Sequence, residues 1–305
     1  MNRFTDFWKN TWKHRAFIVM ALPAFLILLL FAYFPMGGLV LAFKKFDPLL
    51  GIFKSPWVKF DNFKFLFASA GTFKRMTLNT LMYYGIFTAL GTVLNVVLAI
   101  AIDQFVFKKV GKVMQTIMII PVFVSYAAVQ FILTAYIGSS TGIIASRFMH
   151  DAIPFYRSPQ YWPLILTIVK MWNSVGYGSV LYMSVLAGID MSLYEAADID
   201  GANKWQQIRY ITIPSLVPMI TVMLLLSVGN VMRADTGIFY QVTRNTGVLY
   251  PTTQVIDSYI LNALKTKPDF GFTAAATFFQ SVVGLVMMLF ANFSVKKISP
   301  ENALF

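Results

Sequence analysis

The residues of this chain that could do chemistry are a few polar side chains set inside long apolar runs. Lys170 is the one charged residue in the run 158–189, and it shares eight positions with Trp172, Asn173, Ser174 and Tyr177. An ionisable side chain inside a membrane is costly unless it meets water or a partner, so Lys170 is a candidate functional residue. Alternatively, its amine extends outward, because it lies only about 13 Å below the outer end of its run at 1.5 Å per residue. Trp172 and Tyr177 do not share a helix face, so only part of this group can line one path.

Other polar residues lie in apolar runs at helical spacing. Tyr126 and Gln130 are four positions apart and share a helix face, and Asn230 and Arg233 are three positions apart, close to Asp235. These residues are candidates for binding a polar solute. Hydrogen bonds between neighbouring helices are the alternative explanation for both pairs.

The residue types that most catalytic sites need are scarce. The chain has no cysteine, which removes disulfides, cysteine-based zinc sites and thiol catalysis, and it has two histidines, His14 and His150. It also lacks the G-x-x-x-x-G-K-[ST] phosphate loop, because Gly111-Lys112 is followed by Val113 and has no upstream glycine. No ATP site of that type is therefore expected in this chain.

The composition shows which elements must position these side chains. Of the 305 residues, 57% are hydrophobic and only 12% are charged, and the mean hydropathy is +0.65. A soluble globular protein has roughly 45–50% apolar and about 25% charged residues, so a soluble protein is excluded. The net charge of +12 suits a protein beside anionic lipid, where each Lys or Arg contributes about 1 kcal/mol.

Six apolar runs are long enough to cross a membrane, which takes roughly 20 residues. The predicted fold is an all-α integral membrane protein with spans near 17–36, 78–102, 114–136, 162–186, 213–231 and 274–294. The predicted organisation has four parts: a cytoplasmic segment 1–15, a first span with an external segment at 16–75, a five-helix core at 76–295 that contains a loop at 187–212, and a cytoplasmic tail at 296–305.

Basic residues near the ends of the spans predict the orientation. The segments that are inside if the N-terminus is inside carry 11 Lys and Arg, and the outer segments carry 13. Short segments weigh most in the positive-inside rule, and four basic residues precede the first span while three lie in 103–112. This pattern favours both termini inside, which makes the 187–212 loop cytoplasmic and leaves 37–77 and 232–273 outside.

The 187–212 loop predicts two short helices. Ser192 and Glu195 form a Ser-x-x-Glu capping box that starts a helix at about Leu193. Gly201 can end this helix in the left-handed conformation, and a second helix at about 202–211 leads to the next span.

The first of these helices has a small, smooth face and an acidic rim. Ala196 and Ala197 form the face, and four acidic residues surround it: Asp190, Glu195, Asp198 and Asp200. Such a helix could dock into a groove on another protein. The alternative is that the loop lies on the membrane surface with Glu195 acting only as a cap, although a loop of net charge −2 has little reason to sit on anionic lipid.

The same loop resembles the EAA loop of binding-protein-dependent ABC importer permeases. It matches at Glu195-Ala-Ala-x-x-Asp200-Gly201-Ala202 and at Ile211-x-Ile213-Pro214. Further segments resemble the polysaccharide-type carbohydrate permeases: Tyr33-x-Pro35-Met36, Gly51-x-x-x-Ser55-Pro56-Trp57-Val58, Asn79-Thr80, Trp172-x-Ser174-x-Gly176-Tyr177, Val255-Ile256-Asp257-x-Tyr259 and the tail Pro300-Glu-Asn-Ala-Leu-Phe305.

This resemblance implies the fold and partners of a type I importer permease, similar to the maltose permeases. It implies a second homologous permease subunit, two ATP-binding subunits on the cytoplasmic side and an external solute-binding protein. ATP and magnesium would be bound by the ATP-binding subunits, and this chain would hold no cofactor and bind no nucleic acid. The residues that would couple to the ATPase are Glu195, Ala196, Ala197, Asp200 and Gly201.

The resemblance also implies that a sugar passes through the spans. Sugar sites combine aromatic faces with amides and charges, which makes the following residues candidates for the pathway: Tyr126, Gln130, Lys170, Trp172, Asn173, Tyr177, Asn230 and Arg233. The outer segments carry 13 Lys and Arg against six Asp, which fits acidic sugars, although lipid headgroups explain this surplus equally well. Asp257 is either structural or a contact to the binding protein.

The sequence supports three other functions less well. A permease for a non-sugar solute shares the same loop. A secondary transporter would need carboxylates within its spans, but 78–102, 114–136, 162–186 and 213–231 contain no Asp or Glu. A membrane enzyme would lack an evident acid, base or metal site.

Overall fold

The computed structural model describes residues 13–64, 70–104, 108–138, 142–143, 154–266 and 268–303. Their regular structure is helical, apart from one isolated bridge between Lys44 and Trp57. The all-α prediction is therefore confirmed. Residues 1–12, His150 and the last two residues of the predicted tail lie outside the described part of the chain.

The helices are long and apolar enough for six spans. Five helices qualify directly, and a sixth span is formed if two short helices that meet at a sharp bend are counted together. The chain divides into two compact units, Met1–Lys64 with Pro268–Phe278, and Phe65–Lys267 with Phe279–Phe305.

The first unit contains the first span, which is longer than predicted. Its helix is continuous from Arg15 to Phe43 through α2 (Arg15–Leu28), the π-helix η1 (Leu29–Tyr33) and the 3-10 helix η2 (Phe34–Phe43). The predicted end near residue 36 was wrong, because Pro35 stands in the first turn of η2, where its missing N–H costs nothing.

The segment after this span is folded around a buried lysine. Lys44 is 3% exposed, and its Nζ donates to the carbonyl oxygens of Ile52 at 3.3 Å and Phe53 at 2.5 Å. The short helix α3 (Gly51–Lys54) is held in this way. Aromatic rings pack together here, since the Phe43 ring lies 5.4–5.7 Å from the rings of Phe60, Phe63 and Phe278.

The second unit is built on two crossing helices, α5 (Ala70–Asp103) and α9 (Trp162–Leu186), which make the most extensive contact between described helices. The bounds of α9 equal those predicted. Glycines allow the close approach, because a Cβ added at Gly178 would lie 2.5 Å from the side chain of Asn95. The glycine at position 178 therefore lets α9 lie close against α5.

The third predicted span is not one straight helix. It consists of α6 (Lys108–Ile119), the 3-10 turn η4 (Ile120–Phe123) and α7 (Tyr126–Ile137), with a bend of 95°. Pro121 cannot donate a hydrogen bond within a helix, and Ser125 caps the next helix by accepting from Ala128 N–H at 3.3 Å. The prediction of an unbroken helix at 114–136 was wrong because hydropathy does not register these two signals.

The remaining helices of this unit complete the spans and their connections. The loop helices α10 (Met191–Ile199) and α11 (Lys204–Gln207) lead through the π-helix η7 (Ile208–Thr212) into α12 (Ile213–Val228). The connection to the last helix contains η8 (Gly237–Val242), η9 (Gly247–Leu249), α13 (Tyr250–Thr253) and α14 (Ile256–Thr266). The helix α15 (Phe270–Ile298) ends the core.

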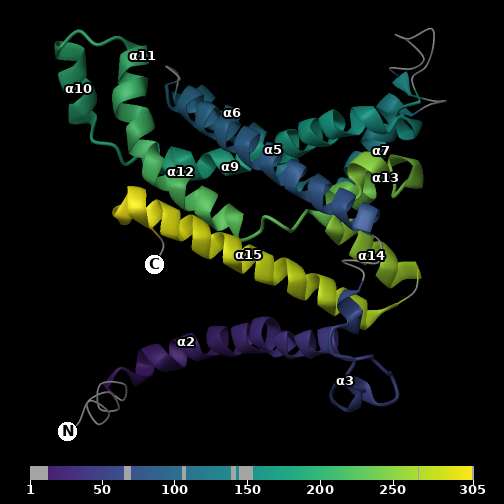
Figure 1. The fold of residues 1–305 in the computed structure, drawn as a ribbon. Coiled ribbons are helices and arrows are strands. Elements are labelled where there is room, and N and C mark those ends of the chain that lie inside the picture. The colour runs from purple at the N-terminus through teal and green to yellow at the C-terminus, as the bar shows by residue number, and fades with distance from the viewer. Residues whose placement is uncertain are drawn as a thin grey trace. The chain divides into compact units, whose positions relative to one another are not determined.

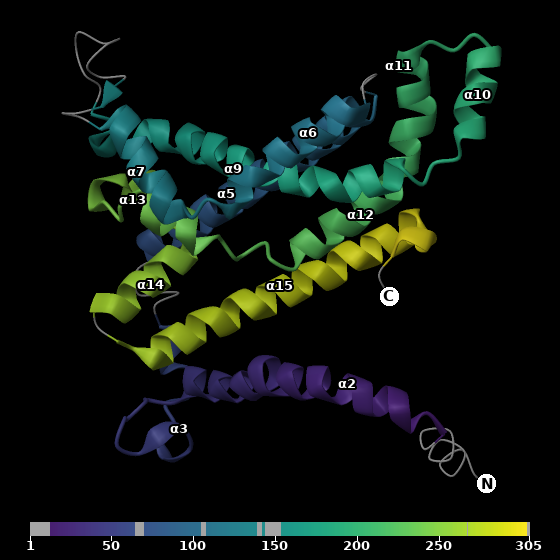
Figure 2. The same cartoon turned by 180° about the vertical axis from the view of Figure 1, so that it is seen from behind.

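Within this unit the two ends are distinct. In both views α10 and α11 lie at the same end as the C-terminal end of α15, and α7, α13 and α14 lie at the opposite end (Figure 1, Figure 2). The latter end has a buried core around Tyr83, Trp162 and Phe239. Asn79 of α5 fastens it by donating to the carbonyl oxygens of Pro251 and Gln254 at 3.2 and 3.1 Å.

Candidate functional site

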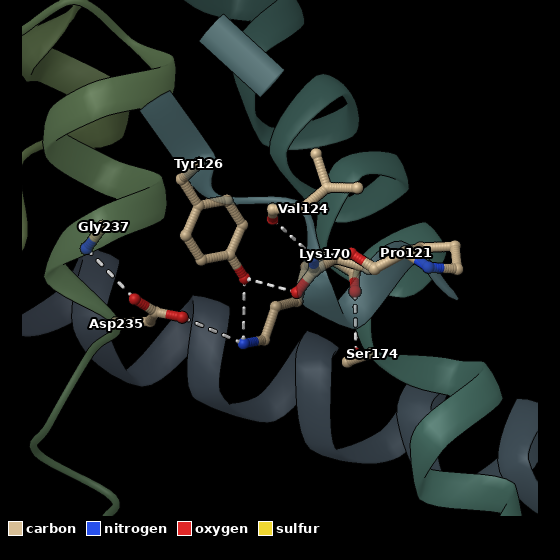
Figure 3. Close-up of polar contacts among 8 residues, drawn as sticks. Pro121, Val124, Tyr126, Lys170, Ser174, Asp235 and Gly237 are labelled. Atoms are coloured by element: carbon tan, nitrogen blue, oxygen red, sulfur yellow. Dashed lines mark hydrogen bonds and ion pairs between the residues drawn. The ribbon is translucent and has the colours of Figure 1, made fainter. Parts of the chain in front are cut away.

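Three separate elements bring polar side chains together around Lys170 (Figure 3). Lys170 lies on α9, Tyr126 is the first residue of α7 after the bend, and Asp235 lies in the irregular linker between α12 and η8. The Lys170 Nζ is 3.2 Å from Asp235 Oδ2 and donates to Tyr126 Oη at 3.4 Å. Tyr126 Oη in turn donates to Asn173 Oδ1 at 3.2 Å.

Asn173 fastens this group to the break in the third span. Its Nδ2 donates to the carbonyl oxygens of Pro121 at 2.7 Å and Val124 at 3.5 Å, at the turn where the Pro121 oxygen also accepts from Val124 N–H at 3.1 Å. Asn173 is 8% exposed. The amide therefore fixes the bend to α9 and places Tyr126 beside Lys170.

The environment of Lys170 suits binding rather than catalysis. The side chains of Lys170 and Asp235 are 24% and 39% exposed, so the protein does not fully enclose either of them. The amine, the phenol and the carboxylate are hydrogen-bonding and charged groups that a polar solute can contact.

Asp235 is the member of this polar group that sequence reasoning missed. It was noted only as a neighbour of Arg233, whereas the structure makes it the counter-ion of Lys170, 65 positions away in the chain. A lysine within an apolar span needs a partner. The alternative in which Lys170 simply extends to the surface does not describe this structure, because its amine is held by Asp235 and Tyr126.

The structure gathers only three of the eight predicted pathway residues around the lysine amine, namely Tyr126, Lys170 and Asn173. Trp172 is 47% exposed and Tyr177 60% exposed, and Trp172 lines an apolar groove of about 400 Å³ with Ile117 and Pro121. Gln130 is half-buried in α7.

The other predicted pair lies at the end of α12. Asn230 and Arg233 are exposed, and Arg233 Nη2 donates to Ser281 Oγ of α15 at 3.1 Å. This contact is a hydrogen bond to a neighbouring helix, which is the alternative explanation given above for Asn230 and Arg233.

Asp257 is held as a structural group. Its Oδ2 accepts from Ala234 N–H at 2.8 Å and from Gln280 Nε2 at 3.1 Å. Burial raises the pKa of the Asp257 carboxyl, while these two hydrogen bonds act in the opposite direction. The carboxylate therefore ties the linker that carries Asp235 to α14 and α15.

The second candidate region is the hairpin of α10 and α11. Gly201 separates them with a φ of +74°, which confirms the predicted left-handed stop. Glu195, Ala196 and Asp200 are exposed, and Ala197 is half-buried.

The predicted cap of the first hairpin helix was wrong by two positions. The N-cap is Asp190, whose side chain accepts from Ser192 N–H at 3.0 Å, and this bond lowers the pKa of Asp190. An aspartate carboxylate serves as well as a serine hydroxyl at this position, and it comes first in the chain. The second helix starts at Lys204 instead of 202, because Asn203 and Gln206 form its capping box.

Polar contacts make the hairpin rigid. Gln207 Nε2 donates to Asp198 Oδ1, and Lys204 Nζ lies 3.6 Å from the same oxygen. Tyr194 and Thr212 share a hydrogen bond of 2.9 Å. These contacts leave a hollow of about 380 Å³ that is lined in part by Glu195 and by Asp103 at the end of α5.

The hairpin also exposes apolar side chains. Ile199 is 87% exposed and Trp205 68% exposed. An exposed apolar group next to an acidic rim is more typical of a protein-binding surface than of a solvated loop. Among the described residues there is no group of three or more His, Asp or Glu that could hold a metal ion.

Comparisons with known proteins give a consistent picture. Residues 91–300 match the family model described as a binding-protein-dependent transport system inner membrane component. Protein LplB of Bacillus subtilis is 29% identical over 287 residues, covering 93% of this chain and 89% of the relative. The polygalacturonan/rhamnogalacturonan transport system permease protein YteP of the same organism is also 29% identical, covering 93% and 88%.

A solved structure has the same fold. It is a chain of a bacterial ABC transporter involved in the import of the acidic polysaccharide alginate, with a TM-score of 0.85 and 31% identity over 96% of this chain and 99% of that chain. A second structure of a bacterial alginate transporter, in complex with a periplasmic protein bound to an alginate pentasaccharide, has a TM-score of 0.84 and 30% identity over 96% and 98%.

Proposed function

Because this chain belongs to the family of binding-protein-dependent transport system inner membrane components, we propose that it is the permease through which oligosaccharides or polysaccharide fragments enter the cell. It is a multi-pass inner membrane subunit, and ATP hydrolysis resides in other subunits. The observation that supports a saccharide substrate is the match over nearly the full length to permeases and transporters of polygalacturonan and alginate.

The partners follow from the same proposal. A second permease subunit completes the pathway, and two ATP-binding subunits dock on the cytoplasmic side. A solute-binding protein delivers the saccharide outside, as the complex of the alginate transporter with its periplasmic protein suggests.

The α10–α11 hairpin is the proposed contact with the ATPase. Glu195 lies exposed on it, next to the two alanines that allow close approach, and Gly201 makes the bend. Because Asp198, Gln207 and Lys204 tie the two helices together, the hairpin can move as one body with α12.

The saccharide pathway is proposed to include the Lys170 group. Tyr126 offers an aromatic face and a hydroxyl beside the amine, and Trp172, two positions further along α9, exposes its indole. Tyr177, Gln130, Asn230 and Arg233 are proposed for the same pathway without a contact to the lysine amine.

The test begins with mass spectrometry of what co-purifies with the chain in mild detergent. The expected result is a second permease and an ATP-binding subunit. Uptake of labelled saccharides into proteoliposomes that contain this complex, with its binding protein, then tests transport. A chain recovered alone as a homo-oligomer, without an ATPase, would contradict the proposal.

Charge reversal tests the coupling residues. Glu195→Lys and Gly201→Asp should leave the protein inserted but reduce ATP-driven uptake at least tenfold, while ATP hydrolysis continues. Glu301→Lys is the matched control, because this exposed residue undergoes the same charge change in the tail. Normal uptake in both hairpin variants would remove the coupling assignment.

A further inference from the structure

The ion pair between Lys170 and Asp235 is asymmetric in how its two members are held. Lys170 lies in the interior of the 25-residue helix α9, and its contact Tyr126 is tied to Asn173. Asp235 lies in a linker without regular structure, its side chain is 39% exposed, and its Oδ1 accepts from Gly237 N–H at 3.0 Å. The helix fixes the backbone of Lys170, and the partly exposed Asp235 carboxylate can leave the pair by rotation of its side chain.

We propose that Lys170 is the receptor for a substrate carboxylate, which replaces Asp235 in a charge exchange. This inference rests on the proposed function and names its substrate class, a saccharide that carries carboxylate groups. A uronate presents the same two oxygens as Asp235, so it can take over the contact at 3.2 Å to Nζ without leaving the amine unpaired.

The exchange discriminates against neutral sugars. A neutral hydroxyl that displaced Asp235 would leave an unpaired lysine in a membrane span, which is costly. A carboxylate restores a charge-assisted hydrogen bond, which is roughly twice as strong as a neutral one. A ligand can shift the balance between the Lys170–Asp235 pair and the opened pair only if it binds one of these two arrangements more tightly than the other.

The positive charge of the outer segments is compatible with this assignment. They carry 13 Lys and Arg against six Asp, so an anionic saccharide is attracted to that face over the Debye length of about 8 Å. The other pair in the linker region, Ala234 N–H with Asp257, anchors the chain just before Asp235 at 2.8 Å. Release of Asp235 therefore needs no movement of the linker as a whole.

Zero-length cross-linking identifies the carboxylate that contacts Lys170. A water-soluble carbodiimide joins an amine to a carboxylate in contact with it, and mass spectrometry of the digested protein identifies both. In the purified complex without saccharide, the expected product joins Lys170 to Asp235. With 10 mM trigalacturonate, that product should fall at least fivefold and Lys170 should carry the trisaccharide.

The controls separate exchange from nonspecific effects. The carboxyl-reduced, neutral trisaccharide and sodium chloride of equal ionic strength should leave the Lys170–Asp235 product unchanged. A second pair in the same chain, Lys204 with Asp198 at 3.6 Å, should not respond to trigalacturonate. Lys265→Gln, which removes an amine over the Tyr240 ring, should leave capture at Lys170 intact.

Two variants test whether Asp235 competes with the saccharide for Lys170. In Asp235→Asn the competitor is gone, so half-maximal capture of trigalacturonate at Lys170 should need about tenfold less saccharide. In Lys170→Gln, capture at this position should vanish. A Lys170–Asp235 product that trigalacturonate does not lower, or that the neutral trisaccharide lowers equally, overturns the exchange.

This outcome is distinguishable from a failure of the proposed function. If the complex takes up saccharides but the cross-link does not respond, the ion pair is a static link between α9 and the linker. If the complex drives uptake of neither the acidic nor the neutral saccharide, the import function itself is wrong.

Discussion

At the scale of single residues, Gly176 limits how close α6 and α9 can lie. A Cβ built on Gly176 would come within 1.7 Å of the carbonyl oxygen of Met118, which no rotamer change relieves. Gly176→Ala should therefore destabilise the protein by about 1–3 kcal/mol, the usual cost of overpacking. The measurement is the thermal unfolding midpoint of the detergent-solubilised protein.

A matched control lies on the neighbouring helix. Gly91 of α5 has only Met171 Cε near the position of an added Cβ, at 4.0 Å. Gly91→Ala should leave stability unchanged or raise it by up to about 1 kcal/mol, because alanine favours a helix interior. Equal effects of the two substitutions would show that the α6–α9 contact is not as close as described.

The buried carboxyl of Asp257 predicts a pH dependence. Burial raises its pKa above the ordinary value of 3.8, so the native state keeps a proton that the unfolded state has already lost. The contribution of Asp257 to the free energy of unfolding is therefore fully present below pH 3.8. It is lost as the pH rises through the raised pKa of the native state. Asp257→Asn, which keeps an oxygen for Ala234 N–H, should remove this loss.

The Asp257→Asn variant should be the more stable of the two at neutral pH, because it has no proton to lose. The difference should shrink as the pH falls toward 4, in unfolding midpoints recorded from pH 4 to 8. Glu301→Gln, at an exposed carboxyl, should show no such trend. A difference that grows on acidification would mean that the hydrogen bonds to Asp257 outweigh its burial.

At the scale of elements, the bend between α6 and α7 depends on Asn173. Asn173→Leu keeps the volume but removes both bonds to the carbonyl oxygens of Pro121 and Val124. The first turn of α7 should then exchange its amide hydrogens faster, by about tenfold, if one buried hydrogen bond contributes about 1–1.5 kcal/mol. Ser174→Ala, which loses only a bond to its own helix at Lys170 O, should change this exchange little.

The same bend shows what the sequence could and could not predict. The bounds of α9 were predicted to the residue, because apolar length marks a span directly and α9 has no break. The third span was predicted as one helix, since its hydropathy is continuous across Pro121. Asp235 could not be assigned to Lys170, because the pairing depends on how the linker after α12 crosses α9, 65 positions away in the chain.

At the scale of the whole molecule, six spans predict that both termini lie on the same side of the membrane. Within the larger unit, the hairpin of α10 and α11 lies at the end where α15 finishes, and η9 belongs to the opposite end with α13 (Figure 2). The predicted orientation makes the former end cytoplasmic. The positive-inside count alone was nearly even, so an independent measurement is decisive.

The chain has no cysteine, so single cysteines report topology without background. Leu49→Cys and Val248→Cys, at side chains 95% and 54% exposed, should react with a membrane-impermeant maleimide in intact spheroplasts. Glu301→Cys should react only after permeabilisation, because the tail is inside if an even number of spans follows an inside N-terminus. Reaction of Glu301→Cys in intact spheroplasts together with protection of both Leu49→Cys and Val248→Cys would invert the topology, and with it the side on which the hairpin is proposed to meet an ATPase. Reaction of Leu49→Cys and Glu301→Cys without permeabilisation, together with protection of Val248→Cys, would mean that the bent α6–α7 pair does not cross the membrane and that the chain has five spans.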